Sequence, residues 1–231
     1  MPINTIFLDA GGTIVWPNWQ RVSTALAAEG VNVDATVLAA VDPHVRRSFD
    51  MAPVIPTATN QRRDWSYWQY FEAILGRSGI EADTAARRAL SVLEQYHRTT
   101  NLWETIPAFV PETLAELRRL GYKLVVVSNS NGTVRQTFDR IGLSGLIDVV
   151  IDSGDERIEK PDPRLFEIAL ERAGATAAAT VHVGDFYCFD VIGARAAGLL
   201  PVLIDEANLY ADADCHRVAS IAELPRLLER I

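Results

Sequence analysis

Asp9 is the first residue whose type and position could do chemistry, because it ends the apolar run at residues 5–8 and precedes the glycine turn Gly11-Gly12. A carboxylate at the carboxyl end of a buried strand is a common position for a catalytic group in an α/β enzyme. There it can attack phosphorus and form an acyl phosphate, which water then hydrolyses. An aspartate after a strand also serves as a turn or helix-cap residue, so Asp9 alone leaves both interpretations open.

Three later segments carry polar residues at strand ends or in loops, namely Ser128, Asn129, Lys160, Asp185 and Asp190. Ser128 follows the run Leu-Val-Val-Val at 124–127, and its hydroxyl with the N–H groups after it can hold a phosphoryl oxygen. The alternative is that Ser128 caps the next helix, although Asn129 and Asn131 could do so equally well.

Lys160 is one of only two lysines in the chain, the other being Lys123. It stands before Pro161, whose ring biases the preceding residue toward an extended conformation, and ahead of a predicted helix. A fixed ammonium group there can neutralise a pentavalent transition state and keep Asp9 ionised. An exposed loop lysine is the ordinary alternative, but this position favours a role in the site.

Asp185 and Asp190 follow the predicted strand 180–183. Mg²⁺ prefers carboxylate, carbonyl and water oxygens in an octahedron. Two acids near one strand end repel each other, so a bound divalent ion is the natural compensation. Asp185 suits direct ligation, and Asp190 suits the orientation of water molecules or of Lys160.

This order resembles the four motifs of the haloacid dehalogenase-like hydrolase superfamily, at residues 9–13, 125–129, 159–162 and 183–190. The resemblance implies that Asp9 is the nucleophile, with catalytic roles for Ser128 and Lys160. The phosphate-binding residues that it implies are Gly12, Thr13, Ser128, Asn129 and Lys160. The magnesium-binding residues that it implies are Asp9, Gly11 through its backbone carbonyl, Asp185 and, by way of the surrounding water, Asp190.

Most phosphatases of that superfamily carry a second aspartate two residues after the first, and here that position is Gly11. The missing carboxyl normally protonates the leaving oxygen, and such general acid–base help is worth roughly 10²- to 10⁴-fold in rate. One explanation is a good leaving group, as in a sugar 1-phosphate or acyl phosphate, or a proton supplied by His44, Asp50 or Glu72. The others are cleavage of a carbon–halogen bond, or binding of a phosphorylated ligand without turnover.

The rest of the sequence favours hydrolysis of a small phosphorylated metabolite with Mg²⁺ as cofactor. Dehalogenases of that superfamily also lack the second aspartate, but they usually have an aromatic residue there and need no metal, whereas Gly184-Asp185 is kept here. Phosphonoacetaldehyde hydrolases have a similar turn but use a cap lysine as a Schiff base, and no lysine occurs between residues 16 and 105. A phosphatase is therefore the leading hypothesis, with a dehalogenase or a catalytically impaired relative as alternatives.

The elements that must position these residues alternate between short apolar runs and helical stretches. We expect strands at 123–128, 148–151, 180–183 and 201–204, and helices at 111–120, 133–141, 164–173, 191–197 and 222–230. Continuous apolar strands imply burial on both faces, as in a parallel sheet. The sequence therefore predicts an α/β core, a Rossmann-like doubly wound parallel sheet, at residues 1–15 and 106–231.

Residues 16–105 have a different pattern, with no convincing strand and four predicted helices at 18–29, 35–49, 61–77 and 82–98, and a loop at 51–60. We expect this insert to form a helical cap domain over the active site. One face of the third helix carries Trp65, Trp68, Phe71 and Leu75. This stripe predicts the core of a helical bundle, or else a pocket wall that includes Tyr67 or Tyr70.

Composition excludes several classes of protein. The chain has 231 residues, 48% of them hydrophobic, and a net charge of −8, which argues against a nucleic-acid partner. Apolar runs fall short of the ~20 residues that span a bilayer. Cys188 and Cys215 lack metal-like spacing, so we expect free thiols and a cytoplasmic protein. The sequence leaves open whether it is a monomer or a homodimer.

Overall fold

The computed structural model describes residues 2–50 and 67–231, with the side chains of Tyr67 and Trp68 left out. The chain consists of two compact units. The first, called the core unit here, comprises Met1–Pro17 and Trp103–Ile231, and the second, the helical unit, comprises Asn18–Leu102. Each unit is described by itself.

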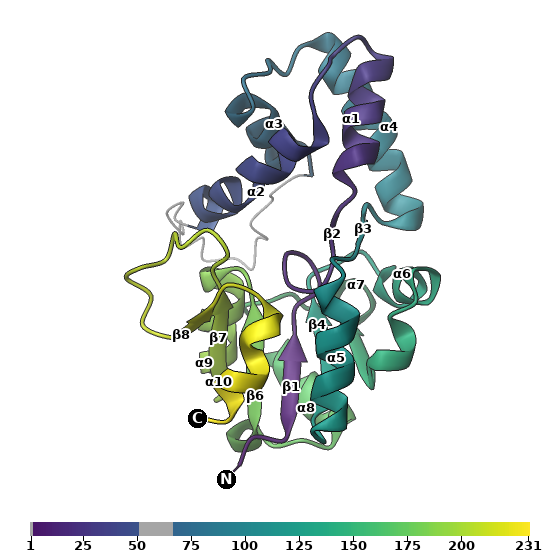
Figure 1. The fold of residues 1–231 in the computed structure, drawn as a ribbon. Helices are drawn as coiled ribbons and strands as arrows, with labels where there is room; N and C mark the ends of the chain where they lie inside the picture. Colours follow the sequence, from purple (N-terminus) through teal and green to yellow (C-terminus); the bar gives the residue numbers. More distant parts are fainter. Residues whose placement is uncertain (1, 51–66) are drawn as a thin grey trace, which may run out of the picture. The chain divides into compact units, whose positions relative to one another are not determined.

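A six-stranded sheet organises the core unit, in the order β5-β4-β1-β6-β7-β8, and every pair of neighbours is parallel (Figure 1). The strands are β1 (Thr5–Leu8), β4 (Lys123–Ser128), β5 (Val149–Asp152), β6 (Thr180–Gly184), β7 (Leu200–Ile204) and β8 (His216–Val218). The chain adds strands first on one side of β1 and then, from β6 on, on the other. In open α/β sheets, ligands bind outside the carboxyl ends of the strands at such a reversal. The predicted α/β fold is confirmed.

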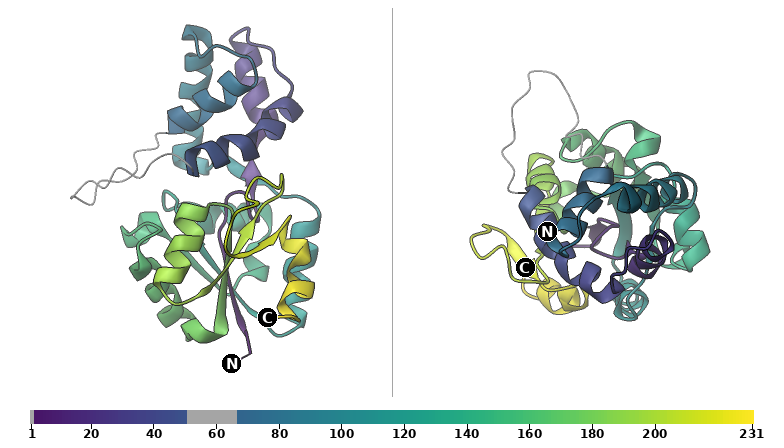
Figure 2. Two further views of the ribbon diagram at one scale, coloured as in Figure 1. Left: turned by 90° about the vertical axis from the view of Figure 1, so that its left-hand side faces the viewer. Right: turned by 90° about the horizontal axis from the view of Figure 1, so that it is seen from above.

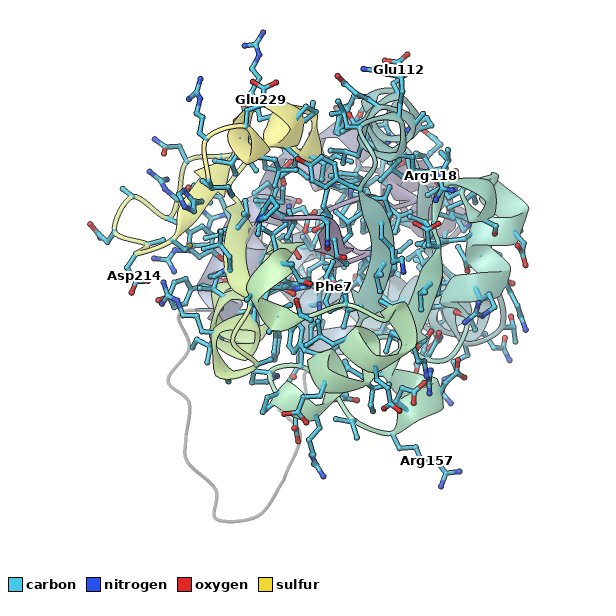
Figure 3. The ribbon with its side chains drawn as sticks, turned by 90° about the horizontal axis from the view of Figure 1, so that it is seen from below. Phe7, Glu112, Arg118, Arg157, Asp214 and Glu229 are labelled. Carbon is cyan, nitrogen blue, oxygen red and sulfur yellow. The ribbon has the colours of Figure 1, made fainter. Side chains whose placement is uncertain are left out.

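Helices cover both faces of this sheet (Figure 2). They are α5 (Phe109–Arg119), α6 (Val134–Ile141), α7 (Ser153–Glu156), α8 (Pro163–Ala173), α9 (Ile192–Ala196) and α10 (Leu224–Leu228). Ile6 and Leu8 point to the apolar layer shared with α5, α6 and α10, whereas Phe7 points to the layer shared with α8 and α9 (Figure 3). The uninterrupted apolar run of β1 is thus explained by burial on both faces, worth about 1.5–3 kcal/mol for each large side chain.

The helical unit consists, among its described residues, of α1 (Trp19–Ala28), α2 (Ala35–Asp50), α3 (Tyr67–Arg77) and α4 (Thr84–Thr100). Asn18 caps α1 and Asp83 caps α4, each through its side-chain oxygen. Phe71 and Leu75 are fully buried, in agreement with a bundle core. Trp65, the side chains of Tyr67 and Trp68, the predicted loop at 51–60 and the predicted helical start at 61–66 lie outside the described part.

The expectation of no strand between residues 16 and 105 is wrong at both ends of that segment. β2 (Trp16–Pro17) pairs antiparallel with β3 (Trp103–Thr105), so the two form a short ribbon in the core unit. Strands of two and three residues show no periodicity, and their pairing joins residues far apart in the sequence. Strand β8, with three residues, is also too short to show periodicity and was not predicted.

The segment after β6 also differs from expectation. A π-helix, Tyr187–Val191, precedes α9, where the sequence predicted a single helix at 191–197. The predicted last helix at 222–230 is a 3₁₀ turn, Ile221–Glu223, followed by α10. Among the described residues, no helix combines the length and apolar character required to cross a membrane.

Candidate active site

Asp9 lies directly after β1, and its exposed fraction is 8%. Its N–H donates to the carbonyl of Val183 in β6 at 2.8 Å, which fixes the backbone at this point. The turn that follows closes on the carbonyl of Ala10, which accepts the N–H groups of Ile14 at 3.0 Å and Val15 at 2.9 Å. Asp9 therefore stands at the carboxyl edge of the sheet on a rigid turn.

Lys160 connects two of the predicted acids. Its Nζ donates to Oδ1 of Asp9 at 2.5 Å and to Oδ1 of Asp190 at 2.6 Å, and only 3% of the residue is exposed. The side chain of Asn129 holds the lysine backbone, since its Nδ2 donates to the Lys160 carbonyl at 3.0 Å and its Oδ1 accepts the Lys160 N–H at 2.7 Å. Residues from all four predicted motifs thus meet at one point.

Asp190 is held by donors on both carboxylate oxygens. Oδ1 also bonds Nε2 of His182 at 2.8 Å, and Oδ2 accepts the N–H of Phe186 at 3.0 Å. Gly184 allows this approach, because a Cβ there would meet Cγ of Asp190 at 2.1 Å. With its oxygens engaged by protein groups, Asp190 is better suited to orienting its neighbours than to direct contact with an ion.

Charge and burial shift the pKa values of this group in different directions. Burial raises the pKa of Asp9, partly offset by the Lys160 ammonium. Burial would also raise the pKa of Asp190, but Lys160 and His182 hold it below its usual range. Burial lowers the pKa of His182, against the opposing effect of Asp190, so its imidazole is neutral. The pKa of Lys160 is raised, because Asp190 and Asp9 outweigh its burial.

Asp9, Asp185 and Asp190 are all buried and each offers a carboxylate oxygen within 4.8 Å of the others. When all three are ionised, they carry three negative charges against one positive charge on Lys160, with His182 neutral, which leaves a net charge of −2. Hard oxygen ligands and an uncompensated double charge suit Mg²⁺. The residues therefore fit the metal that the sequence predicts.

Ser128 ends β4, is 4% exposed and lies opposite Asp152 in the register of β5. Asp152 accepts the N–H groups of Gly132 at 3.0 Å, Val134 at 3.1 Å and Gly154 at 2.9 Å. Asp152 thereby accepts the N–H of Val134 at the start of α6. From the sequence alone, Ser128, Asn129 and Asn131 were the candidates for this capping role. Hydrogen bonds to Asp152, at the end of the neighbouring strand β5, thus hold the loop after Ser128 in place.

The turn after Asp9 contains the remaining predicted residues. The N–H of Gly12 donates to Val15 at 2.9 Å, so this amide is engaged within the turn. Thr13 is 1% exposed, and its Oγ1 has no hydrogen-bond partner in the described structure. A Cβ built at Gly11 would lie 3.1 Å from both Cδ1 and Nε1 of Trp103.

Three residues of this region were not recognised in the sequence: His182, Asp152 and Trp103. His182 is a polar residue inside the buried strand β6, two positions before Gly184, and that placement could have indicated a hydrogen-bond partner for a nearby acid. Asp152 ends β5 and is followed by Ser153 and Gly154, and an aspartate directly after an apolar run is a common N-cap residue. No local signal indicated that Trp103 would lie against Gly11.

Comparison with known proteins identifies the family. The model of the haloacid dehalogenase-like hydrolases matches residues 3–198, so the chain belongs to the haloacid dehalogenase-like hydrolase family. The recognition made from the four motifs is confirmed.

Two relatives and one solved structure illustrate the breadth of this family. Haloacid dehalogenase-like hydrolase domain-containing protein 3 of Danio rerio is 36% identical over 121 residues, covering 51% of this chain and 50% of that protein. Glyceraldehyde 3-phosphate phosphatase of Methanothermobacter thermautotrophicus is 36% identical over 104 residues, covering 44% of this chain and 46% of that protein. The match spans about half the length of each relative. L-2-haloacid dehalogenase from Xanthobacter autotrophicus shares the fold, with a TM-score of 0.63 and 21% identity over 99% of both chains.

Proposed function

We propose that this hydrolase is a Mg²⁺-dependent phosphatase that acts on a small phosphorylated metabolite through an aspartyl-phosphate intermediate. The observation that carries the proposal is the buried contact of Lys160 with both Asp9 and Asp190, at 2.5 and 2.6 Å, beside Asp185. A lysine that neutralises acids at the carboxyl edge of the sheet can also neutralise a phosphoryl group bound there. The match to a relative named glyceraldehyde 3-phosphate phosphatase supports the same chemistry.

Asp9 is the proposed nucleophile, and one of its oxygens forms the bond to phosphorus while the leaving group departs. Lys160 orients this carboxylate through Oδ1, and its ammonium opposes the rise in the pKa of Asp9 that burial causes. The hydroxyl of Ser128 and the backbone N–H of Asn129 bind phosphoryl oxygens, while the Asn129 side chain holds Lys160. Gly12 and Thr13 form the other side of the phosphate site, with Gly12 acting through the shape of the turn.

Asp9, Asp185 and the carbonyl of Gly11 would hold Mg²⁺, and Asp190 would orient its water ligands. The bound ion supplies positive charge that stabilises the phosphoryl oxygens in the transition state. Asp190 also keeps Lys160 protonated.

The helical unit is proposed as the cap that selects the substrate and excludes water. A proton supplied by His44, Asp50 or Glu72 of that unit is the alternative to a leaving group that departs without proton donation. The proposed setting is a cytoplasmic protein, monomeric or dimeric, without a nucleic-acid or membrane partner. Cys188 and Cys215, which are both free thiols, are compatible with a reducing compartment.

The test is hydrolysis of p-nitrophenyl phosphate with Mg²⁺ by the wild-type protein and Asp9→Asn. The amide is a poor nucleophile of similar shape, so we expect turnover to fall to the background of the assay. Asp212→Asn, at an exposed site, is the control and should keep wild-type turnover. Undiminished turnover in Asp9→Asn would contradict the nucleophile assignment.

The dehalogenase alternative has one observation in its favour, because Trp103 brings an aromatic ring against Gly11. It predicts release of halide from a 2-haloacid in the presence of EDTA. A protein that only binds its ligand would instead show Mg²⁺-dependent binding of inorganic phosphate and no turnover of either substrate class.

A further inference from the structure

We infer that Trp103 is a specificity-determining residue, which fills the space of a side chain at residue 11 and restricts the enzyme to substrates whose leaving group departs without proton donation. This inference rests on the proposed function. It names the substrate class: acyl phosphates, enol phosphates, aryl phosphates and phosphates on a hemiacetal oxygen, as opposed to phosphates of simple alcohols.

The geometry around Gly11 shows that the indole, and not the backbone, requires glycine there. The φ angle of Gly11 is not among the positive ones, unlike that of Gly12 at 68°. The three atoms nearest to a Cβ at this position all belong to Trp103: Cδ1 and Nε1 at 3.1 Å and Cγ at 4.0 Å. A side chain at residue 11 is therefore compatible with the turn, but even its Cβ requires Trp103 to shift by a few tenths of an ångström.

Trp103 is anchored to the core unit on both sides. It pairs with Pro17 in the β2–β3 ribbon and packs against the apolar layer of the sheet. The next residue, Glu104, has a side chain only 6% exposed and forms an ion pair of 2.5 Å with Arg140 of α6. Trp16 of the same ribbon packs edge-on against Phe109, with ring centroids 6.2 Å apart. The indole is thus held in place by several contacts.

The chemistry of indole decides what this arrangement can do. Its pyrrole edge, Cδ1 and Nε1, lies over Gly11, two residues from the proposed nucleophile Asp9. An indole N–H donates a hydrogen bond but neither delivers nor takes up a proton near neutral pH. A leaving oxygen beside it must therefore depart as a stable anion, and the roughly 10²- to 10⁴-fold contribution of a general acid is lost for any other substrate.

The test compares acetyl phosphate and p-nitrophenyl phosphate with glycerol 1-phosphate, using wild type, Gly11→Asp, Trp103→Ala and the double variant. We expect wild type to prefer the first two substrates by at least about 10²-fold in kcat/KM. Gly11→Asp alone should gain nothing on glycerol 1-phosphate, because the indole obstructs the new carboxyl group. Gly11→Asp with Trp103→Ala should lose most of the preference, with a rise in glycerol 1-phosphate hydrolysis of at least about tenfold and a new ionisation in its pH profile.

The matched control is Gly11→Asp with Trp16→Ala, which removes an indole from the same ribbon but not from Gly11. It should behave as Gly11→Asp alone. A wild-type enzyme without preference, a Gly11→Asp variant as active on glycerol 1-phosphate as the double variant, or a double variant that folds and keeps the preference would each overturn the inference.

A measurement of melting temperature, which needs no substrate, tests the Gly11–Trp103 contact independently of activity. Gly11→Ala should lower the melting temperature of the wild-type chain more than that of Trp103→Ala, since the added Cβ meets the indole only in the former. An equal decrease in melting temperature in the two backgrounds would contradict the contact between residue 11 and Trp103. If wild type hydrolyses none of the three phosphates while this thermal coupling holds, the proposed function has failed and the Gly11–Trp103 contact has not.

Discussion

Two buried ionic clusters occur in the described structure, one in each unit, and they are built differently. The Lys160 cluster consists of Lys160, Asp9, Asp190 and His182, which come from widely separated segments of the core unit. The Asp42 cluster joins Asp42 and Arg46 of α2, whose Nε–Oδ1 distance is 3.3 Å, with the hydroxyl of Tyr70 in α3, which donates to Asp42. Both carboxylates are buried, but their surroundings differ in charge.

The difference in charge distinguishes the Lys160 cluster, which belongs to the candidate active site, from the Asp42 cluster, which is a structural contact. Among the contacts that the structure describes in the Asp42 cluster, one carboxylate faces one guanidinium, so the charges of this pair balance. In the Lys160 cluster, with the adjacent Asp185 included, three carboxylates face one ammonium. A fold gains nothing from burying excess charge of one sign, because desolvation costs several kcal/mol for each ion. The excess therefore points to a cationic or transition-state partner, and each prediction below tests that contrast.

Lys160→Met should have the largest effect. Methionine keeps most of the length of the side chain but removes the positive charge that Lys160 places between Asp9 and Asp190, so we expect turnover of p-nitrophenyl phosphate to fall by at least about 10³-fold. The measurement is kcat at saturating Mg²⁺. The chain offers one matched control in its other lysine, Lys123, whose Nζ donates to the carbonyl of Ala173 at 2.5 Å. Lys123→Met should keep the wild-type kcat. An equal loss of kcat in both variants would show that Lys160 has no specific role in turnover.

Asp42→Ala should instead reduce stability. It removes the carboxylate beside the buried Arg46, and breaking such a pair costs about 3 kcal/mol, or roughly 10²-fold in the unfolding equilibrium. Urea denaturation followed by circular dichroism measures this loss. Asp42→Leu combined with Arg46→Met should recover most of it, because an apolar pair of similar volume replaces a balanced ion pair. A double variant as unstable as Asp42→Ala would show that the Asp42 cluster does more than hold α2 and α3 together.

The same contrast explains what could be predicted from the sequence. The apolar runs of β1, β4 and β6 indicated their own burial and a common edge, so Asp9, Ser128 and Asp185 could be assigned to one place. The resemblance to the family added Lys160 to them. The Asp42 cluster carried no such signal, since Asp42 and Arg46 have the i, i+4 spacing of any exposed helical pair. Their burial depends on how α2 packs against α3.

Contacts between distant segments limited the prediction of the site in a similar way. The sequence indicated that an acid was missing at Gly11, but not that Trp103 lies there, because β2 and β3 pair across 85 intervening residues of the helical unit. Asn129 was assigned to phosphate binding, and the structure gives its side chain a further role, since it holds the backbone of Lys160. The types of the side chains predicted which residues belong to the site. Which partner each side chain binds depended on tertiary contacts that the sequence did not reveal.

His182 allows the smallest and most specific test of the Lys160 cluster. The residue is fully buried, its ring lies edge-on to Phe166 at 4.9 Å, and its Nε2 is 2.8 Å from Oδ1 of Asp190. Because an ionised carboxylate only accepts hydrogen bonds, Nε2 carries the hydrogen and the neutral ring acts as a fixed donor. The imidazole thus positions Asp190, which in turn positions Lys160.

His182→Phe fits the aromatic surroundings but removes this donor, whereas His182→Gln retains an N–H of similar reach. A hydrogen bond to a charged group contributes about 1.5–3 kcal/mol, and only part of it acts on the reaction, so we expect kcat to fall about tenfold in His182→Phe. KM should change little, because His182 does not touch the substrate, and His182→Gln should recover most of the rate. Equal losses in the two variants, at equal melting temperatures, would mean that His182 serves packing alone and that the Lys160 cluster ends at Asp190.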